Sequence, residues 1–258
     1  MVARLKKLQG KGSYLEQNLD LEMTKWSLES VAVVGLGTRL GSLEDNLAND
    51  HPARILIQCA RDILELSWKL EFFPSLWRYY ETRNFKKMIK TLDLQWEASV
   101  KFIEEAKRKI NERGHDVPEE DKSIIEKLLA VDDKVAIMMA NEMLLAGIDT
   151  IDVIAPNEFL SKMEKHYPRA KEFIPERWLV DKSDPLYYGN CHPMITLPFG
   201  FGVRSCIGRR IAEMEIEIFV KKLLSDVKVT WEGPPVQVGT KVLNSLKKPY
   251  CFKFQSVS

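Results

Sequence analysis

The chain has 258 residues, of which 45% are apolar, so it is long enough to bury a sizeable core and is not a disordered sequence. Lysine and arginine together number 38 against 37 aspartate and glutamate residues, so the net charge gives no reason to expect a nucleic-acid partner. The four cysteines are widely spaced and no run of 18 apolar residues occurs, so the sequence predicts neither a disulfide framework nor a transmembrane span.

Residues 1–150 are predicted to be almost wholly helical, with asparagine, glycine and proline breaks between amphipathic stretches. Two of these stretches are Leu92–Ile110 and Lys134–Leu145. The expected apolar stripe of the first consists of Trp96, Val100, Ile103 and Ile110. The spacing therefore predicts a helical region over the first 150 residues.

One segment of this region, Val31–Gly41, imitates a dinucleotide-binding fingerprint because an apolar run precedes spaced glycines. That fingerprint requires a strand before the glycines, whereas helical spacing continues here through Trp26, Ser30 and Val33. We expect a helix ending in this segment, with Ser42 opening the next one. A Rossmann oxidoreductase is the alternative, which NAD(P)H binding would support.

Residues 151–258 have a different sequence pattern from residues 1–150. Prolines punctuate a loop-rich segment as far as Gly202, and helical spacing returns over Ile207–Leu224. The apolar side of that helix is predicted to contain Ile211, Met214, Ile218 and Val220–Leu224. The tail alternates like two short strands, VKVTWEG and YCFKFQS, around a Gly-Pro-Pro turn. The predicted fold class is mainly α with minor β.

The stretch LPFGFGVRSCIGRR, residues 197–210, places one thiol, Cys206, just before this helix. Unpaired backbone amides and the positive end of the helix dipole favour a thiolate there. The glycines of the stretch let a bulky flat group approach the backbone, and Arg204 supplies a cation for a carboxylate. Together these features predict a haem held by an axial cysteinate. A structural cysteine in a glycine-rich turn is the plainer alternative.

The pattern F-x-x-G-x-R-x-C-x-G is matched at every fixed position by Phe199, Gly202, Arg204, Cys206 and Gly208. This segment resembles the haem-binding loop of the cytochrome P450 superfamily. The resemblance implies that the cofactor is haem b and that Cys206 is the axial ligand of its iron. It also implies that Arg204 contacts a propionate and that Phe199 packs under the ring.

A second motif, LAGIDT, covers Leu145–Thr150. Ala146 and Gly147 are small enough to open a gap for dioxygen and substrate, although a glycine costs a helix about 1 kcal/mol. Asp149 and Thr150 offer an acid and a hydroxyl that can relay protons. The motif resembles the A-G-x-D-T of the distal, oxygen-binding helix of the family. An ordinary helix end with a glycine cap is the alternative.

The segment FIPERWL, Phe173–Leu179, resembles the family's P-E-R segment, whose arginine joins the glutamate and arginine of an E-x-x-R helix. Only 24 residues separate Thr150 from Pro175, where the family has many more, and the E-x-x-R helix is missing. The E-x-x-R at Glu105–Arg108 precedes LAGIDT and is interpreted as a solvated helix face. The resemblance therefore implies a chain that is truncated at the N-terminus and deleted internally.

The resemblance covers essentially all of residues 1–258, as one partial cytochrome P450 domain. Residues 1–150 would end in the distal helix, and residues 151–258 would hold the haem-thiolate loop, the proximal helix and the C-terminal strands. TKWSLESVAVVGLGTRLG and WEASVKFIEEAKRKINERG are similar to the mitochondrial, insect-like branch. Membership of that branch implies location at the mitochondrial inner membrane.

The activity implied by this branch is a monooxygenase reaction. One oxygen atom from O2 would enter an apolar, steroid-like or xenobiotic molecule, with electrons from a ferredoxin-type donor. The missing E-x-x-R helix leaves a second hypothesis open for this chain. It is a non-catalytic truncated product, a splice form or fragment without stable haem, or an interaction module.

Overall fold

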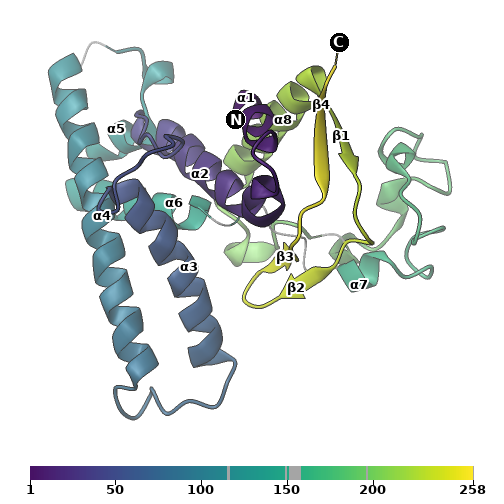
Figure 1. Cartoon of the computed structure of the whole chain (residues 1–258), viewed down its shortest axis with the longest axis horizontal. Coiled ribbons are helices and arrows are strands. Elements are labelled where there is room, and N and C mark those ends of the chain that lie inside the picture. The colour runs from purple at the N-terminus through teal and green to yellow at the C-terminus, as the bar shows by residue number, and fades with distance from the viewer. Residues whose placement is uncertain (115–116, 149, 151–157, 196, 258) are drawn as a thin grey trace. The chain divides into compact units, whose positions relative to one another are not determined.

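The computed structural model describes residues 1–114, 117–148, 150, 158–195 and 197–257. The chain divides into two compact units, of which the first combines Met1–Asp152 with Arg210–Ser258 and the second is Val153–Arg209. The first unit contains the long helices and the strands, and the second consists largely of short turns (Figure 1). Within the described ranges, no helix is long and apolar enough to cross a bilayer.

The helices of the first unit start and stop at local sequence signals. They are α1 (Val2–Gln9), α2 (Tyr14–Leu36), α3 (Pro52–Glu71), α4 (Arg83–Arg113), α5 (Ile124–Leu129), α6 (Asp133–Ile148) and α8 (Arg209–Asp226). At the start of α4, the Thr82 hydroxyl accepts a hydrogen bond from the Phe85 amide at 3.3 Å, which satisfies one of the free amides of the first turn. The end of α2 is set by Gly37, whose φ of 68° is left-handed and suits glycine.

The apolar run Val31–Leu36 therefore belongs to α2, and the strand that a dinucleotide fingerprint requires is not there. The prediction that Ser42 opens a helix is wrong, because turns follow and the next helix begins at Pro52. Ser42 instead donates from its amide (3.0 Å) and its hydroxyl (2.7 Å) to the buried Glu29 carboxylate. These hydrogen bonds hold the loop against α2, so the polar side chain serves packing.

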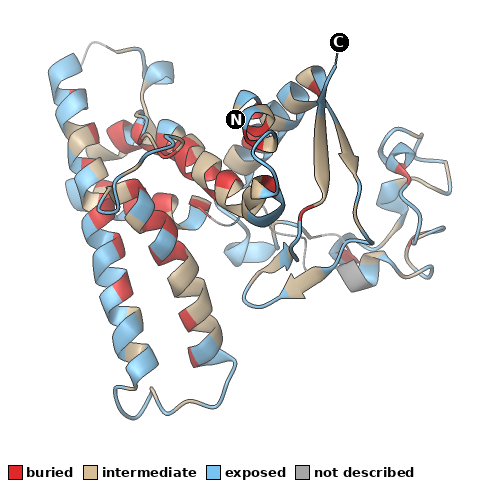
Figure 2. Cartoon of the chain, in the orientation of Figure 1, coloured by how far each residue is buried: buried red, intermediate tan, exposed pale blue. Residues whose placement is uncertain are grey.

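The main core lies where α2, α3, α4, α5 and α6 meet (Figure 2). Its fully buried members include Leu28, Leu56, Ile103, Ile125, Leu144 and Ile148. The predicted stripe of α4 is partly wrong, because Trp96 is exposed and the buried face contains smaller residues such as Ala98 and Ala106. Small residues let α3 and α4 run closely side by side, which favours that packing over burial of the indole.

The strands form two antiparallel pairs. β1 (Val227–Trp231) pairs with β4 (Phe252–Ser256), and β2 (Val238–Thr240) pairs with β3 (Asn244–Leu246). The two predicted tail strands are thus confirmed, but a second strand pair lies between them in the chain where a single Gly-Pro-Pro turn was expected. The predicted class, mainly α with minor β, is confirmed.

A second, smaller cluster joins α1 to α8 and β4. Leu5 and Leu8 of α1 pack against Phe219 and Leu223 of α8 and against Phe254 of β4. The prediction for α8 is therefore partly right: Leu223 is covered and Ile211 is half-buried, but Phe219 was not expected and the large apolar residues outside the cluster are exposed. These exposed residues are Met214, Ile216, Ile218, Val220 and Leu224. The helix has apolar residues on almost every side, which is typical of a helix buried all round.

The second unit contains α7 (Glu158–Ser161) and short 3-10 turns. The turns cover Pro175–Trp178, Tyr188–Asn190, Pro193–Ile195 and Gly202–Arg204. Its buried side chains include Tyr167, Ile174, Arg177 and Ile195, which is few for a unit of this length. The loop-rich character predicted for this part of the chain is thus observed.

Candidate functional site

The loop that contains Cys206 is closed by its own backbone. The Cys206 amide donates to the Phe199 carbonyl oxygen at 2.8 Å, and the Ser205 amide donates to that of Gly202 at 3.1 Å. Gly200 and Gly202 turn the chain with φ values of 69° and 67°, a region that other residues enter only with strain. The thiol is exposed at the end of this loop, directly before α8.

The surroundings of the thiol fit a flat acidic ligand. Gly208 lies beside the thiol, because a Cβ there would be in van der Waals contact with the Cys206 sulfur at 3.9 Å. Arg204 is exposed and has no ion-pair partner among the described residues, which leaves its guanidinium available for a carboxylate. Arg209 lies over the Phe199 ring, with 5.3 Å between the guanidinium carbon and the ring centroid. One soft sulfur donor, an uncrowded approach and a cation suit the thiolate side of a haem.

The other predicted site residues lie at the C-terminal end of α6. Their helix has one buried face, made of Ala136, Ala140, Leu144 and Ile148, and one open face, made of Val135, Met138, Glu142, Ala146 and Thr150. The Thr150 hydroxyl donates to the Ala146 carbonyl oxygen at 2.7 Å. Asp149, the predicted acid, lies outside the described residues. Ala146 and Thr150 are therefore neighbours on the same exposed surface.

Gly147 lies against α2. A Cβ at Gly147 would lie 2.9 Å from a methyl carbon of Val31, so the absence of a side chain allows the two helices to touch. The Ser27 hydroxyl, one turn before Val31, donates to the Gly147 carbonyl oxygen. The small size of Gly147 is thus used in helix packing, and the gap for dioxygen stays a prediction that rests on Ala146.

We expect Gly147→Ala to lower the free energy of unfolding by about 1 to 3 kcal/mol, because the added methyl overlaps Val31. Thermal or urea unfolding of the purified chain measures this change. Val31→Ala in the same chain should recover part of the loss by making room. Gly10→Ala is the matched control, since a Cβ there would lie 3.7 Å from its nearest neighbour. An equal effect at both glycines would contradict the packing explanation.

Arg177 of the P-E-R segment is buried. Its Nη2 donates to the carbonyl oxygens of Pro168 (2.5 Å) and Arg169 (2.9 Å), and its guanidinium lies 5.6 Å from the centroid of the Tyr167 ring. Its Nη1 is buried and has no hydrogen-bond partner among the described residues. A buried unpaired donor costs about 1 to 3 kcal/mol, more when it is charged.

Glu105 and Arg108, the E-x-x-R of the chain, are exposed and pair with each other at 2.7 Å on α4. Their pairing is the ordinary i,i+3 contact of a solvated helix face. They lie in the first unit, whereas Arg177 lies in the second. The acid that Arg177 is predicted to require is therefore not identified among the described residues.

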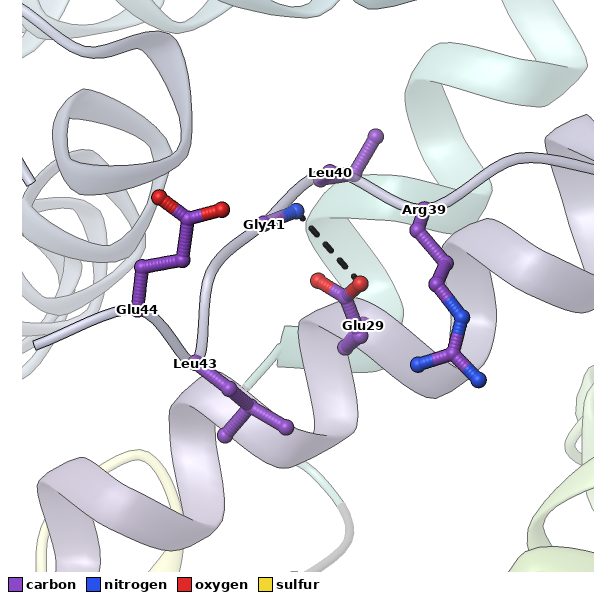
Figure 3. A pocket seen from close by; sticks show the side chains of 6 residues that line it. All are labelled: Glu29, Arg39, Leu40, Gly41, Leu43 and Glu44. Atoms are coloured by element: carbon purple, nitrogen blue, oxygen red, sulfur yellow. Dashed lines mark hydrogen bonds between the residues drawn. The ribbon is translucent and has the colours of Figure 1, made fainter.

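A cleft of about 530 Å³ opens beside the loop that follows α2 (Figure 3). Its lining residues are Glu29, Arg39, Leu40, Gly41, Leu43 and Glu44. The Glu29 carboxylate already accepts hydrogen bonds from the backbone amides of Gly41 and Ser42. None of the predicted site residues lines this cleft, and its main acid is occupied by the loop itself.

Ser27 and Val31 were not identified from the sequence as part of the site. Their i,i+4 spacing places them on one face of α2, but that spacing alone does not say which helix they meet. The useful signal was the small residue pair at Ala146 and Gly147, because small residues mark close helix contacts as well as ligand gaps. A sequence-based prediction could not choose between these two uses.

Comparison with known proteins gives relatives of one family. The cytochrome P450 family model matches residues 150–254. Cytochrome P450 CYP12A2 of Musca domestica is 31% identical, with 93% of this chain and 62% of the relative covered. Probable cytochrome P450 12a5, mitochondrial, of Drosophila melanogaster is 28% identical, with 95% and 62% covered. The chain thus spans about 62% of the length of these curated relatives.

The alignment with CYP12A2 extends over 335 positions although the chain has 258 residues. At least 77 of those positions (335 less 258) therefore have no residue of this chain opposite them. Relatives thus contain a substantial amount of sequence, within the matched region, that this chain lacks.

Solved structures agree on the fold. The crystal structure of a cytochrome P450 (CYP102L1) has a TM-score of 0.67 at 15% identity and covers 100% of this chain and 77% of its own. The cytochrome P450DA heme domain has a TM-score of 0.62 at 12% identity, with 93% and 68% covered. The thiol loop, the helical fold and the insect relatives agree: residues 150–254 match the cytochrome P450 family model, and the chain as a whole is similar to cytochromes P450.

Proposed function

We propose that this chain holds haem b through Cys206 and is related in function to the mitochondrial haem-thiolate monooxygenases. The observation that supports this most strongly is the closed loop of residues 199–208, which presents one exposed thiol and matches the family pattern at every fixed position. Haem is the cofactor of the cytochrome P450 family, whose model matches residues 150–254. Arg204, Phe199, Gly202 and Gly208 would complete the proximal side of the site.

The residues have separate tasks in this proposal. Cys206 would give its sulfur to the iron, Arg204 would bind a propionate, and Phe199 would cover the ring near the sulfur. The bound haem would supply the activation of dioxygen for insertion of one oxygen atom into an apolar substrate. Gly202 and Gly208 carry no side chains, so they would leave room for the haem beside the loop.

Thr150 would handle a proton in this proposal. Its hydroxyl hydrogen is directed to the Ala146 carbonyl oxygen, so its oxygen lone pairs are left to accept a hydrogen bond. A hydroxyl in this state can pass on a proton from a water molecule or from Asp149, and Ala146 leaves space beside it. Asp149 and Thr150 are therefore the proposed proton-relay pair, with Ala146 and Gly147 as their small neighbours.

The electron donor in this proposal is a ferredoxin-type protein, and the location is mitochondrial, at the inner membrane. The mitochondrial location is supported by relatives that are named as mitochondrial cytochromes P450. The donor and the inner-membrane position are what the resemblance to that branch implies. Lys221 and Lys222 of α8 are basic, but they pair with Glu217 and Asp226 on the same helix. The lysines therefore do not add independent support for an acidic partner.

A second candidate is a non-catalytic product without stable haem. It is favoured by the unpaired Nη1 of Arg177, by the exposed apolar residues of α8, and by the relatives' additional sequence. We place the deletion after Thr150, where only 24 residues, Ile151–Ile174, precede Pro175. In that case the helix that should neutralise Arg177 is encoded elsewhere or not at all.

One experiment separates the two candidates. The chain is expressed with a haem precursor, purified, reduced under carbon monoxide and examined by absorption spectroscopy. The haem-thiolate proposal expects one haem per chain and the strongly red-shifted Soret band that marks thiolate ligation. A colourless product, or a Soret band typical of an iron without thiolate, would support the non-catalytic candidate.

A further inference from the structure

The contact between α2 and the end of α6 contains a polar element in addition to the apolar packing. Ser27 is 1% exposed, and its hydroxyl donates to the Gly147 carbonyl oxygen. Val31, one turn further along α2, fills the space that a side chain at position 147 would need. Ser27 and Val31 form a single contact face against Gly147, within the LAGIDT motif.

Ser27 supplies a hydrogen-bond donor for a carbonyl group at the end of α6. The last four carbonyl groups of a helix have no intrahelical partner, and α6 ends at Ile148. The Ala146 carbonyl oxygen accepts from the Thr150 hydroxyl at 2.7 Å, and the next one, of Gly147, accepts from Ser27. Two successive carbonyls are thus satisfied by hydroxyl groups, one from the motif itself and one from another helix.

A second polar contact fixes α6 closer to its middle. The buried Gln95 of α4 donates to the Asn141 side-chain oxygen at 2.8 Å and to the Ser99 hydroxyl oxygen at 2.9 Å. Asn141 and Gly147 therefore tie α6 to two different helices. Because these contacts fix its rotation, Ala146 and Thr150 remain on the open face.

We propose that Ser27 is a positioning residue, which sets the rotation and the end point of α6 and so directs the Thr150 hydroxyl. Its consequence for oxygen chemistry rests on the proposed function, whereas its effect on α6 does not. Removal of the hydroxyl would leave the partly buried Gly147 carbonyl oxygen without its donor. The end of the helix would then fray, and the Thr150 hydroxyl would lose the fixed position of its acceptor, the Ala146 carbonyl oxygen.

The test is amide hydrogen exchange on the haem-free chain, which separates local from global opening. We expect Ser27→Ala to increase exchange at least tenfold over residues 145–148 and at Thr150, with the core of α3 and α4 unchanged. Ser27→Thr, which keeps the donor, should restore protection. Ser30→Ala is the matched control, because Ser30 is half-buried on the same helix and donates no hydrogen bond to a described residue.

Uniform acceleration across the whole core, or no change at the end of α6, would overturn the proposal. Should Ser27→Ala fail to fold, Ser27→Cys keeps the shape with a weaker donor and is expected to give a smaller, still local, increase. In haem-loaded protein, Ser27→Ala should raise the fraction of consumed oxygen that is released as peroxide. If the chain takes up no haem, the proposed function is wrong. The exchange measurement still tests the role of Ser27, because it uses the haem-free chain.

Discussion

Replacement of Cys206 by serine is expected to abolish the thiolate signature entirely. A serine hydroxyl has almost the same size, but it is not deprotonated near neutral pH and is a hard donor, so it cannot act as an anionic sulfur ligand. The loop itself should survive, because its closing hydrogen bond is made by the Cys206 backbone amide and not by the side chain. The expected result is loss of the red-shifted Soret band in the reduced carbon monoxide complex.

Cys191→Ser is the matched control for this prediction. Cys191 lies in the same unit, and its thiol contacts the Tyr188 carbonyl oxygen at 3.1 Å. Its replacement should leave haem content and spectrum unchanged. If Cys206→Ser kept the thiolate spectrum, or if Cys191→Ser lost it, the assignment of the axial ligand would be wrong.

Replacement of Glu215 by glutamine is expected to stabilise the chain at neutral and alkaline pH. Glu215 is 8% exposed on the covered face of α8, and its Oε1 has no hydrogen-bond partner among the described residues. Burial raises the pKa of this carboxyl from 4.5 to about 7. Ionisation of the buried acid therefore costs the folded state free energy that the unfolded state does not lose.

The direction of the pH effect on stability follows from the pKa of Glu215, which is 4.5 in the unfolded chain and about 7 in the folded chain. Below pH 4.5 the carboxyl is protonated in both states and carries no penalty. Between pH 4.5 and about 7 the folded state holds its proton more tightly, so stability falls as the pH rises. Above that range the whole penalty, about 2 to 3 kcal/mol, is present. Glu215→Gln should remove it, so the gain in unfolding free energy is expected at pH 8 and not at pH 4.

Chemical unfolding of both chains across this pH range measures the difference. Glu217→Gln on the exposed side of α8 is the control, because hydrogen bonding to Lys221 lowers the pKa of the Glu217 carboxyl. That substitution should cost a little stability at pH 8, in the opposite direction. A Glu215→Gln gain that is the same at pH 4 and pH 8 would show that the burial of charge is not its cause.

The sequence was sufficient for the helices and for the thiol loop. The spacing over Lys134–Leu145 predicted α6, and the motif around Cys206 predicted a glycine-rich stretch with a thiol directly before a helix. In both cases the determinants are local: apolar periodicity, and glycines that take left-handed φ values. Local determinants can be recognised without knowledge of the partners.

The faces of the helices were harder to predict. On α8 the cluster contains Leu223, which was expected, and Phe219, which was not, whereas the expected Met214 and Ile218 are exposed. Apolar side chains occur on both sides of this helix, so periodicity alone could not select the side that meets α1. Trp96 fails for a related reason, since close packing of small residues outweighed burial of one large ring. The roles of Ser27 and Val31 also depend on a long-range contact.

The uncovered apolar residues of α8 have a consequence for the life of this chain in a cell. Ile216, Val220 and Leu224 recur at every fourth position, so they form one continuous exposed apolar strip that is about two turns long. Holdase chaperones and proteases act on strips of this kind. The abundance of the chain would then be governed by its rate of degradation, and a second polypeptide that shields the strip would lengthen its half-life.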